Sequence, residues 1–313
     1  MRSSFVYAVA WVASVGALAP DFDSFVTHAV GKWKGAAYCW QRTAENDDYL
    51  PLGVAPGYIT PPSACSTEVS EVMRSCGGAV QGVQEERRCQ PADGTVALNR
   101  QVDGTTFFTY GSWANAPALL SDGAESDLLT SPKCFGISVN LAHADATRRR
   151  LLLVISDASL LCCDVAIEQR MPPGDLDAEL DDEVAAALLQ RRVQCVVEAN
   201  AWEGGASKLT LSGSSPSEDW INARTKWSVV EGDLEGGTPL VPASGENGDV
   251  AYMPGGCWVR VAPRQGGGTL VEVGSIAAAA GEVKAITHAY DPVAGGGSGL
   301  QLSKVEFSKI TAR

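Results

Sequence analysis

The sequence has few of the residues that build metal and catalytic centres. Its 313 residues include only three histidines, His28, His143 and His288, and none has a histidine or cysteine at the spacing of a metal site. A nucleophile elbow, a phosphate loop and a complete dinucleotide fingerprint are also missing from the sequence. We therefore predict no catalytic residues and no metal ligands, and the sequence identifies no cofactor.

Positive charge is also scarce. The chain carries 24 Lys and Arg against 37 Asp and Glu, which gives a formal net charge of -13. An acidic surface repels nucleic-acid phosphates, so we do not expect a nucleic-acid partner. The simplest interpretation of this charge is that it keeps the protein soluble.

Only one long apolar run occurs, at residues 5–19, and it ends in Ala17-Leu18-Ala19. It fits the core of a signal peptide and is too short to span a bilayer comfortably, so we do not expect an integral membrane protein. With Pro20 directly after it, the run resembles the bipartite plastid address of algae with complex red plastids, where Phe is usual in place of Leu18. We predict a targeting segment over residues 1–19 that leads to a plastid, with the secretory pathway as the alternative.

The 33 glycines and 16 prolines favour many short strands and turns over long helices. Alternating or continuous apolar runs predict strands at residues 33–43, 104–113, 134–141, 148–156, 160–170, 195–211, 250–261, 268–276, 283–291 and 300–310. Residues 45–103 are interpreted as a long insertion that holds some further strands and one helix around residues 66–74. Its cysteines, Cys65, Cys76 and Cys89, are candidates for a local disulfide.

Two helices are predicted. Residues 20–29 place Phe22, Phe25, Val26 and Ala29 on one face. Residues 175–194 have acidic residues at the start and arginines at the end, which matches the helix dipole. We take the second helix as the boundary, which gives an N-terminal domain at residues 20–172, a linker helix at 173–194 and a C-terminal domain at 195–313.

The run Arg148-Arg149-Arg150 opens one of the predicted strands. Three arginines at the start of a strand usually form a solvated edge that discourages strand pairing. We therefore expect these side chains to lie in water, and we regard a phosphate or headgroup site there as the less favoured alternative.

The order of several motifs repeats along the chain. Trp33-Lys34-Gly35 corresponds to Trp202-Glu203-Gly204, Gly111-Ser112-Trp113 to Gly256-Cys257-Trp258, and residues 150–157 to residues 284–291. The same order of elements indicates a degenerate internal duplication, whose first copy carries the cysteine-containing insertion.

These motifs resemble those of the domain of unknown function 3598 family, a calycin-like family of cyanobacteria and plastid-bearing eukaryotes. The resemblance rests on Gly31-Lys32-Trp33-Lys34-Gly35, on residues 107–113 with Arg148-Arg149-Arg150, and on residues 253–258 with Tyr290-Asp291. It implies an all-β fold of two calycin or lipocalin-like antiparallel β-barrels in tandem, with a short N-terminal helix that closes one barrel end and one linking helix. Such barrels imply a cavity for an apolar ligand, whereas the fold alone implies no chemistry.

In the lipocalin pattern a tryptophan closes the barrel floor beneath a basic side chain from the last strand. The resemblance therefore assigns this structural role to Trp33 with Arg170 and to Trp202 with Lys309. The candidate ligand-binding residues are aromatic or polar: Trp113, Trp258, Arg260, Glu272 and His288. We expect a contact between Glu272 and His288 only if both side chains face inward.

We expect a non-catalytic plastid protein that binds or carries a small hydrophobic ligand such as a tetrapyrrole, a carotenoid or a lipid. One alternative is an enzyme of the chromophore-lyase or isomerase type that acts inside the barrel. Another is a structural or assembly partner of photosynthetic complexes, with a photosynthetic protein as its partner.

Overall fold

The structure is a computed structural model, and it describes most of the predicted strands. The described residues are 22–43, 55, 57–60, 63–73, 80–89, 94–99, 105–108, 111–121, 130–172, 204–212, 227–233, 249–277, 280–294 and 299–312. None of the helices in these ranges is long and apolar enough to cross a membrane. The predicted targeting segment at residues 1–19, the linker helix at 173–194 and Trp202 lie outside the described residues.

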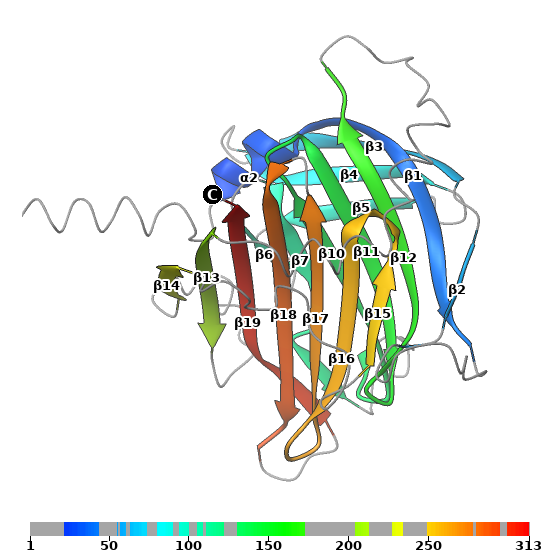
Figure 1. The fold of residues 1–313 in the computed structure, drawn as a ribbon, viewed down its shortest axis with the longest axis vertical. Coiled ribbons are helices and arrows are strands. Elements are labelled where there is room, and N and C mark those ends of the chain that lie inside the picture. Colours follow the sequence, from blue (N-terminus) through cyan, green and yellow to red (C-terminus); the bar gives the residue numbers. More distant parts are fainter. Residues whose placement is uncertain are drawn as a thin grey trace, which may run out of the picture.

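Almost all of the described chain forms two antiparallel sheets (Figure 1). Sheet A has 11 strands: β1 (Gly31–Arg42), β2 (Gly57–Ile59), β3 (Ser63–Met73), β4 (Val80–Cys89), β5 (Gly94–Asn99), β6 (Thr105–Phe107), β7 (Trp113–Asn115), β9 (Thr130–Ser131), β10 (Cys134–Ala142), β11 (Thr147–Ser156) and β12 (Ser159–Arg170). Sheet B has eight: β8 (Leu119–Ser121), β13 (Gly204–Ser212), β14 (Trp227–Asp233), β15 (Asp249–Met253), β16 (Cys257–Arg264), β17 (Gly268–Ala277), β18 (Glu282–Pro292) and β19 (Gly299–Ala312). Helix α2 (Phe22–Ala29) precedes β1, and the 3-10 turn η3 (Pro254–Gly256) precedes β16. The predicted two-part, all-β fold is therefore confirmed.

The two sheets have the same strand order. Sheet A runs β3-β1-β12-β11-β10-β7-β6 after its edge strands β5 and β4, and sheet B runs β14-β13-β19-β18-β17-β16-β15. The seven strands β13 to β19 thus each have a counterpart in sheet A at the same place in the chain order. This correspondence supports the internal duplication predicted from the repeated motifs.

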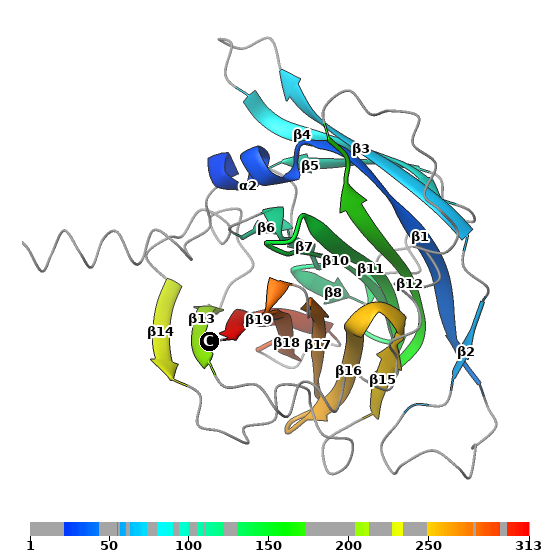
Figure 2. The ribbon, with the colours of Figure 1, turned by 45° about the horizontal axis from the view of Figure 1, so that its top comes forward.

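The sheets face each other and share one apolar core (Figure 2). On β10, for example, Phe135, Ile137, Val139 and Leu141 are buried toward sheet B because alternate side chains of a strand point to one face. The residues of sheet B in the same cluster include Val259, Val261, Val271, Val273, Ile286, Val305 and Phe307. We call the cluster that the two sheets form together the shared core. Strand β8 comes from the first half of the chain but pairs with β19, so the halves are also joined by backbone hydrogen bonds.

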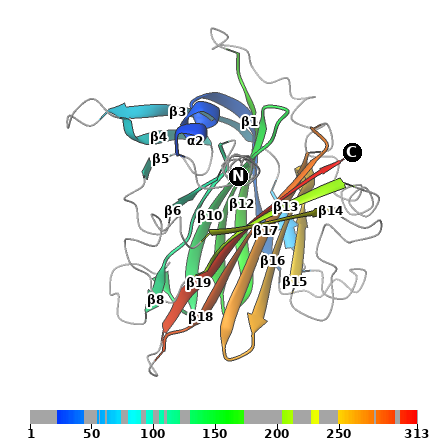
Figure 3. The same ribbon diagram turned by 90° about the vertical axis from the view of Figure 1, so that its left-hand side faces the viewer.

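The opposite face of sheet A is enclosed because the sheet curls over itself. Glu85 on β4 and Arg148 on β11 are separated by three intervening strands, yet their side chains are 3.1 Å apart. In a flat sheet this separation would be about 19 Å, at about 4.8 Å per strand. Strands β3, β4 and β5 therefore run across the upper part of β10 to β12, as Figure 1 shows, and in Figure 3 they project to one side of these strands. We call this curled sheet the half-barrel.

Helix α2 covers one end of the half-barrel. Its Phe25, Val26 and Ala29 pack with Trp33 of β1 and Trp113 of β7 in a separate apolar cluster. These helix residues include three of the four predicted for one face, so the amphipathic pattern placed this helix correctly.

The long insertion predicted at residues 45–103 contains strands β2 to β5. The helix predicted around residues 66–74 is wrong, because residues 63–73 form β3, which pairs with β1 and β4. In β3 the buried residues Cys65, Thr67 and Val69 alternate with exposed Ala64, Glu68 and Ser70, a period of two that the polar composition concealed.

Candidate functional site

The interior of the half-barrel contains a cluster of charged side chains. We call it the charge cluster, and it consists of Glu85, Arg87, Arg148, Arg150 and Glu168. Four of its five members are almost completely buried; Arg87 is the exception. Strands β4, β11 and β12 supply these residues, so the curling of the sheet assembles the cluster.

Glu168 is the centre of the cluster. Its Oε2 accepts hydrogen bonds from Nε of Arg148 at 2.8 Å and Nε of Arg150 at 2.7 Å, and its Oε1 accepts one from Nη2 of Arg150 at 3.1 Å. Thr67 on β3 also donates to Oε1. Such charge-assisted bonds are stronger than neutral ones, and here they offset the cost of burying the carboxylate.

Glu85 is shared by the three arginines. Its Oε2 is 3.2 Å from Nη2 of Arg87, and its Oε1 is 3.1 Å from Nη2 of Arg148 and 3.6 Å from Nε of Arg150. Burial by itself raises the pKa of both glutamates, but the attraction of Arg148 and Arg150 outweighs it and holds both pKa values below the usual range. Both carboxylates are therefore ionised at neutral pH.

The prediction that Arg148-Arg149-Arg150 forms a solvated edge is wrong. Arg148 and Arg150 point into the half-barrel, and Arg149 points the other way, where its Nε donates to the carbonyl of Gly255 at 3.1 Å. The prediction failed because the run lies on β11, between β10 and β12. The continuous apolar run that follows, residues 151–155, is the sequence signal that could have shown it, because such a run is typical of a strand buried on both faces.

Trp33 has the structural position predicted for it, but with a different cation. The guanidinium carbon of Arg148 lies 4.3 Å from the centre of the Trp33 ring, which is a cation–π contact. Arg170 is the cross-strand partner of Trp33, but its Nη2 donates to the carbonyl of Val30 just beyond α2. The predicted pairing of Trp33 with Arg170 is thus corrected to Trp33 with Arg148.

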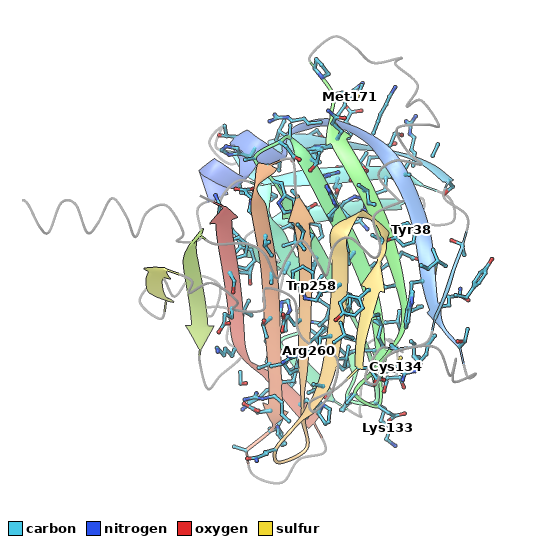
Figure 4. The ribbon with its side chains drawn as sticks, in the orientation of Figure 1. Tyr38, Lys133, Cys134, Met171, Trp258 and Arg260 are labelled. Carbon is cyan, nitrogen blue, oxygen red and sulfur yellow. The ribbon has the colours of Figure 1, made fainter. Side chains whose placement is uncertain are left out.

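The predicted ligand residues of the second half do not form one site. On β16 and β17, Nε1 of Trp258 donates to Oε1 of Glu272 at 3.4 Å, and Nε of Arg260 lies 3.8 Å from Oε2 of the same carboxylate. Figure 4 shows where Trp258 and Arg260 lie on sheet B. Glu272 pairs with Thr287 of β18, so His288 points to the opposite face of sheet B. Trp113 belongs to the cluster under α2 in the half-barrel and is far from this group in the strand order.

His288 instead faces the shared core. It is 1% exposed, and its Nδ1 has no hydrogen-bond partner among the described residues. Two other buried polar atoms of the shared core share this property, Oη of Tyr290 and Nε1 of Trp40. Burial lowers the pKa of His288 to about 3, so the ring is neutral, and burial raises the pKa of Tyr290.

A second polar group, the cross-sheet cluster, joins the two sheets near η3. It consists of His143, Ser275, Glu282, Lys284 and Lys309. Nε2 of His143, in the turn between β10 and β11, is 2.7 Å from Oγ of Ser275 on β17, and its Nδ1 is 3.6 Å from Oε2 of Glu282 on β18. Nδ1 of His143 has no hydrogen-bond partner among the described residues, so the three side chains follow one another as a hydroxyl, an imidazole and a carboxylate, but Glu282 does not hold the ring by a hydrogen bond.

Two lysines form ion pairs with Glu282, the carboxylate of the cross-sheet cluster. Nζ of Lys309 is 2.8 Å from Oε1 of Glu282, and Nζ of Lys284 is 3.4 Å from Oε2. Burial lowers the pKa of Lys284 to about 8 and that of His143 to about 4. Lys309 was predicted to cover Trp202, which lies outside the described residues, so that pairing stays a prediction.

The cysteines do not indicate a metal site. Among the described residues no group of three or more His, Cys, Asp or Glu is placed to hold a metal ion. Cys65 is disulfide-bonded, as expected for a cysteine of the insertion, and Cys89 lies opposite it on β4. The adjacent Cys162 and Cys163 are both free.

Comparison with known proteins bears on the fold. No model of a protein family and no curated protein matches the sequence. The structure of a protein of unknown function from the DUF3598 family of Nostoc punctiforme matches with a TM-score of 0.55 and 11% identity, over 93% of this chain and 98% of that chain. A TesB protein of Mycobacterium avium subsp. paratuberculosis aligns over 96% of this chain and 85% of its own at 8% identity, and its TM-score of 0.14 does not indicate a shared fold. The chain therefore has the fold of the DUF3598 family, as the repeated motifs predicted.

Proposed function

We propose that the protein binds a small, mainly apolar ligand in the shared core and does not convert it chemically. The observation that carries this proposal is the set of three buried polar atoms without partners among the described residues: Nδ1 of His288, Oη of Tyr290 and Nε1 of Trp40. Each buried polar group without a hydrogen bond costs about 1–3 kcal/mol, so native proteins rarely keep one without a reason. A ligand with a few polar atoms supplies the missing partners.

The surroundings of these atoms fit an apolar ligand body. His288 pairs with Val271 and Val305 on the neighbouring strands, and the ring of Tyr290 lies 5.1 Å from that of Phe135. Apolar walls with a few oriented polar groups are typical of small-molecule sites.

The unpaired groups also narrow the ligand class. A tyrosine hydroxyl and an indole N–H can both donate, and a neutral imidazole can donate or accept. A ligand with oxygen or nitrogen atoms, such as a tetrapyrrole, an oxygenated carotenoid or a polar lipid, satisfies them better than a pure hydrocarbon.

The test is to purify the protein from its native cell and to record its absorbance spectrum and lipid extract. We expect a co-purifying pigment or lipid, and its loss in a His288→Leu variant. Protein that carries no such molecule, or a variant that retains it fully, would contradict the proposal.

A second candidate function is an enzyme of the chromophore-lyase or isomerase type. It is favoured by the arrangement of Ser275, His143 and Glu282, in which a hydroxyl, a neutral imidazole and a carboxylate follow one another. Bilin transfer or isomerisation that Ser275→Ala abolishes would support it, whereas an inert wild-type protein would count against it.

The predicted destination is a plastid, and the predicted partner there is a photosynthetic protein, for which this protein would serve as a carrier or an assembly factor. The apolar run at residues 5–19 and Pro20 after it support this proposal. Fusion of residues 1–43 to a fluorescent protein in an alga with complex plastids tests it. Secretion of the fusion would favour the alternative route.

A further inference from the structure

The charge cluster inside the half-barrel contains more positive than negative groups. Among the described residues it holds three guanidinium groups, of Arg87, Arg148 and Arg150, and two carboxylates, of Glu85 and Glu168. Arginine stays protonated in proteins, and both carboxylates are ionised. The cluster as described therefore carries one excess positive charge.

Two of the arginines also have unused hydrogen-bond donors. Nε of Arg87 and Nη2 of Arg148 are buried and have no hydrogen-bond partner among the described residues. Nη2 of Arg148 lies 3.1 Å from Oε1 of Glu85, which also has no hydrogen-bond partner among the described residues, so these two atoms form an ion pair without an aligned hydrogen bond. Both arginines already form ion pairs with Glu85, and Arg148 also donates to Glu168. What a further anion would satisfy is the one excess positive charge and the two donor atoms without a hydrogen bond.

An apolar surface adjoins these donors. Arg148 lies over the ring of Trp33, which packs with Phe25 and Val26 of α2 and with Trp113. A molecule with one negative charge and an apolar tail matches both parts of this interior.

We propose that the half-barrel interior binds an amphiphilic acid with a single negative charge, such as a long-chain carboxylic acid. Its carboxylate accepts hydrogen bonds from Arg87 and Arg148, and its tail lies against the tryptophans under α2. This site is on the face of sheet A opposite the shared core, so it is independent of the ligand proposed there.

The experiment uses the full chain stripped of lipid and compares dodecanoate with 1-dodecanol, which has the same tail and no charge. Calorimetric titration is expected to show at least tenfold tighter binding of dodecanoate, with quenching of tryptophan fluorescence. Equal affinities for acid and alcohol, or no binding of dodecanoate, would overturn the proposal without any variant being needed.

Arg87 and Arg88 provide a matched pair of variants. Arg87 has a side chain that is 14% exposed and faces the cluster, whereas the side chain of Arg88, the next residue, is 76% exposed and pairs with Glu86. Arg87→Gln is expected to weaken dodecanoate binding about tenfold and to leave dodecanol binding unchanged, while Arg88→Gln changes neither. Thermal unfolding checks that both variants fold, and identical dodecanoate affinities in the two folded variants would contradict the assignment.

A further control separates the two proposed sites. His288→Leu alters the shared core and is expected to leave dodecanoate affinity within twofold of wild type. A loss of dodecanoate binding in this variant would place the acid in the shared core and overturn the half-barrel site.

Discussion

The two faces of sheet A enclose interiors of opposite character. Toward sheet B the shared core is apolar, and polar atoms in it such as Nδ1 of His288 have no hydrogen-bond partner among the described residues. On the other face, inside the half-barrel, the charged groups of Glu85, Arg148, Arg150 and Glu168 are concentrated and bind one another. Both interiors are closed to water to a similar degree, so burial alone does not decide which groups a sheet face carries.

The difference shows that the free-energy cost of burying a charged group depends on whether oppositely charged partners are buried beside it. A guanidinium and a carboxylate offset much of each other's desolvation when hydrogen bonds align them, whereas a single imidazole gains nothing from valine neighbours. Removing one member is therefore expected to be costly in the half-barrel and favourable in the shared core.

The largest effect is expected for Glu168→Gln. The substitution leaves Arg148 and Arg150 buried with one shared carboxylate, and breaking a buried ion pair typically costs about 3–5 kcal/mol. Denaturant unfolding measures the loss. Glu86→Gln is the control, because its carboxylate is about half exposed and pairs with exposed Arg88, and a change of at most about 0.5 kcal/mol is expected. A similar small loss for both variants would show that the charge cluster contributes little.

The second effect is a loss of stability in acid. Burial lowers the pKa of His143 to about 4 and of His288 to about 3, from 6.5 in the unfolded chain. At pH values between the folded-state pKa and 6.5, the unfolded chain binds more protons than the folded protein. The free energy of unfolding therefore falls as the pH falls below about 6.5. Each histidine contributes a slope of up to about 1.4 kcal/mol per pH unit. Unfolding midpoints from pH 7 to 5 check this, and a flat profile would contradict the neutral, buried state of both rings.

Removal of the hydroxyl that joins the sheets is expected to have a moderate effect. Ser275→Ala deprives Nε2 of His143 of its partner at 2.7 Å, and leaving a buried group unpaired costs about 1–3 kcal/mol. The matched control is Ser138→Ala, since Ser138 is a half-buried serine on β10. Equal denaturation midpoints for the two variants would show that the cross-sheet cluster does not hold the sheets together.

The smallest effect is expected to have the opposite sign. In ligand-free protein His288→Leu replaces an unpaired polar group by an apolar one, so stability is expected to rise by about 1 kcal/mol. The same variant is expected to lose about half of the acid sensitivity described above. Destabilisation would mean that His288 has a partner in the folded protein that its described neighbours do not provide.

Gly274 is a position where the side chain of a residue on the neighbouring strand requires glycine. A Cβ built there would lie 2.0 Å from the ring of Trp258 on the neighbouring strand, so only glycine leaves room for the indole. The sequence marks the strand and the tryptophan, but it does not show that the ring lies across this residue.

The strands and helix α2 were predictable because their signal is local. The alternation at residues 134–141 and 283–291 and the four apolar residues of 22–29 follow from periods of two and 3.6 residues. The repeated motifs likewise indicated two similar halves, and the common strand order of the two sheets agrees with them.

The sequence by itself determined which residues alternate, where strands end and that the chain repeats. Only the tertiary structure decided that Arg148 and Arg150 lie inside, that Arg148 rather than Arg170 covers Trp33, and that Glu272 and His288 face apart. The physical reason is that alternation assigns a side chain to one of two faces but does not say which face is closed to water. That depends on contacts such as Glu85 with Arg148, which lie 63 residues apart in the chain and meet only because the sheet curls.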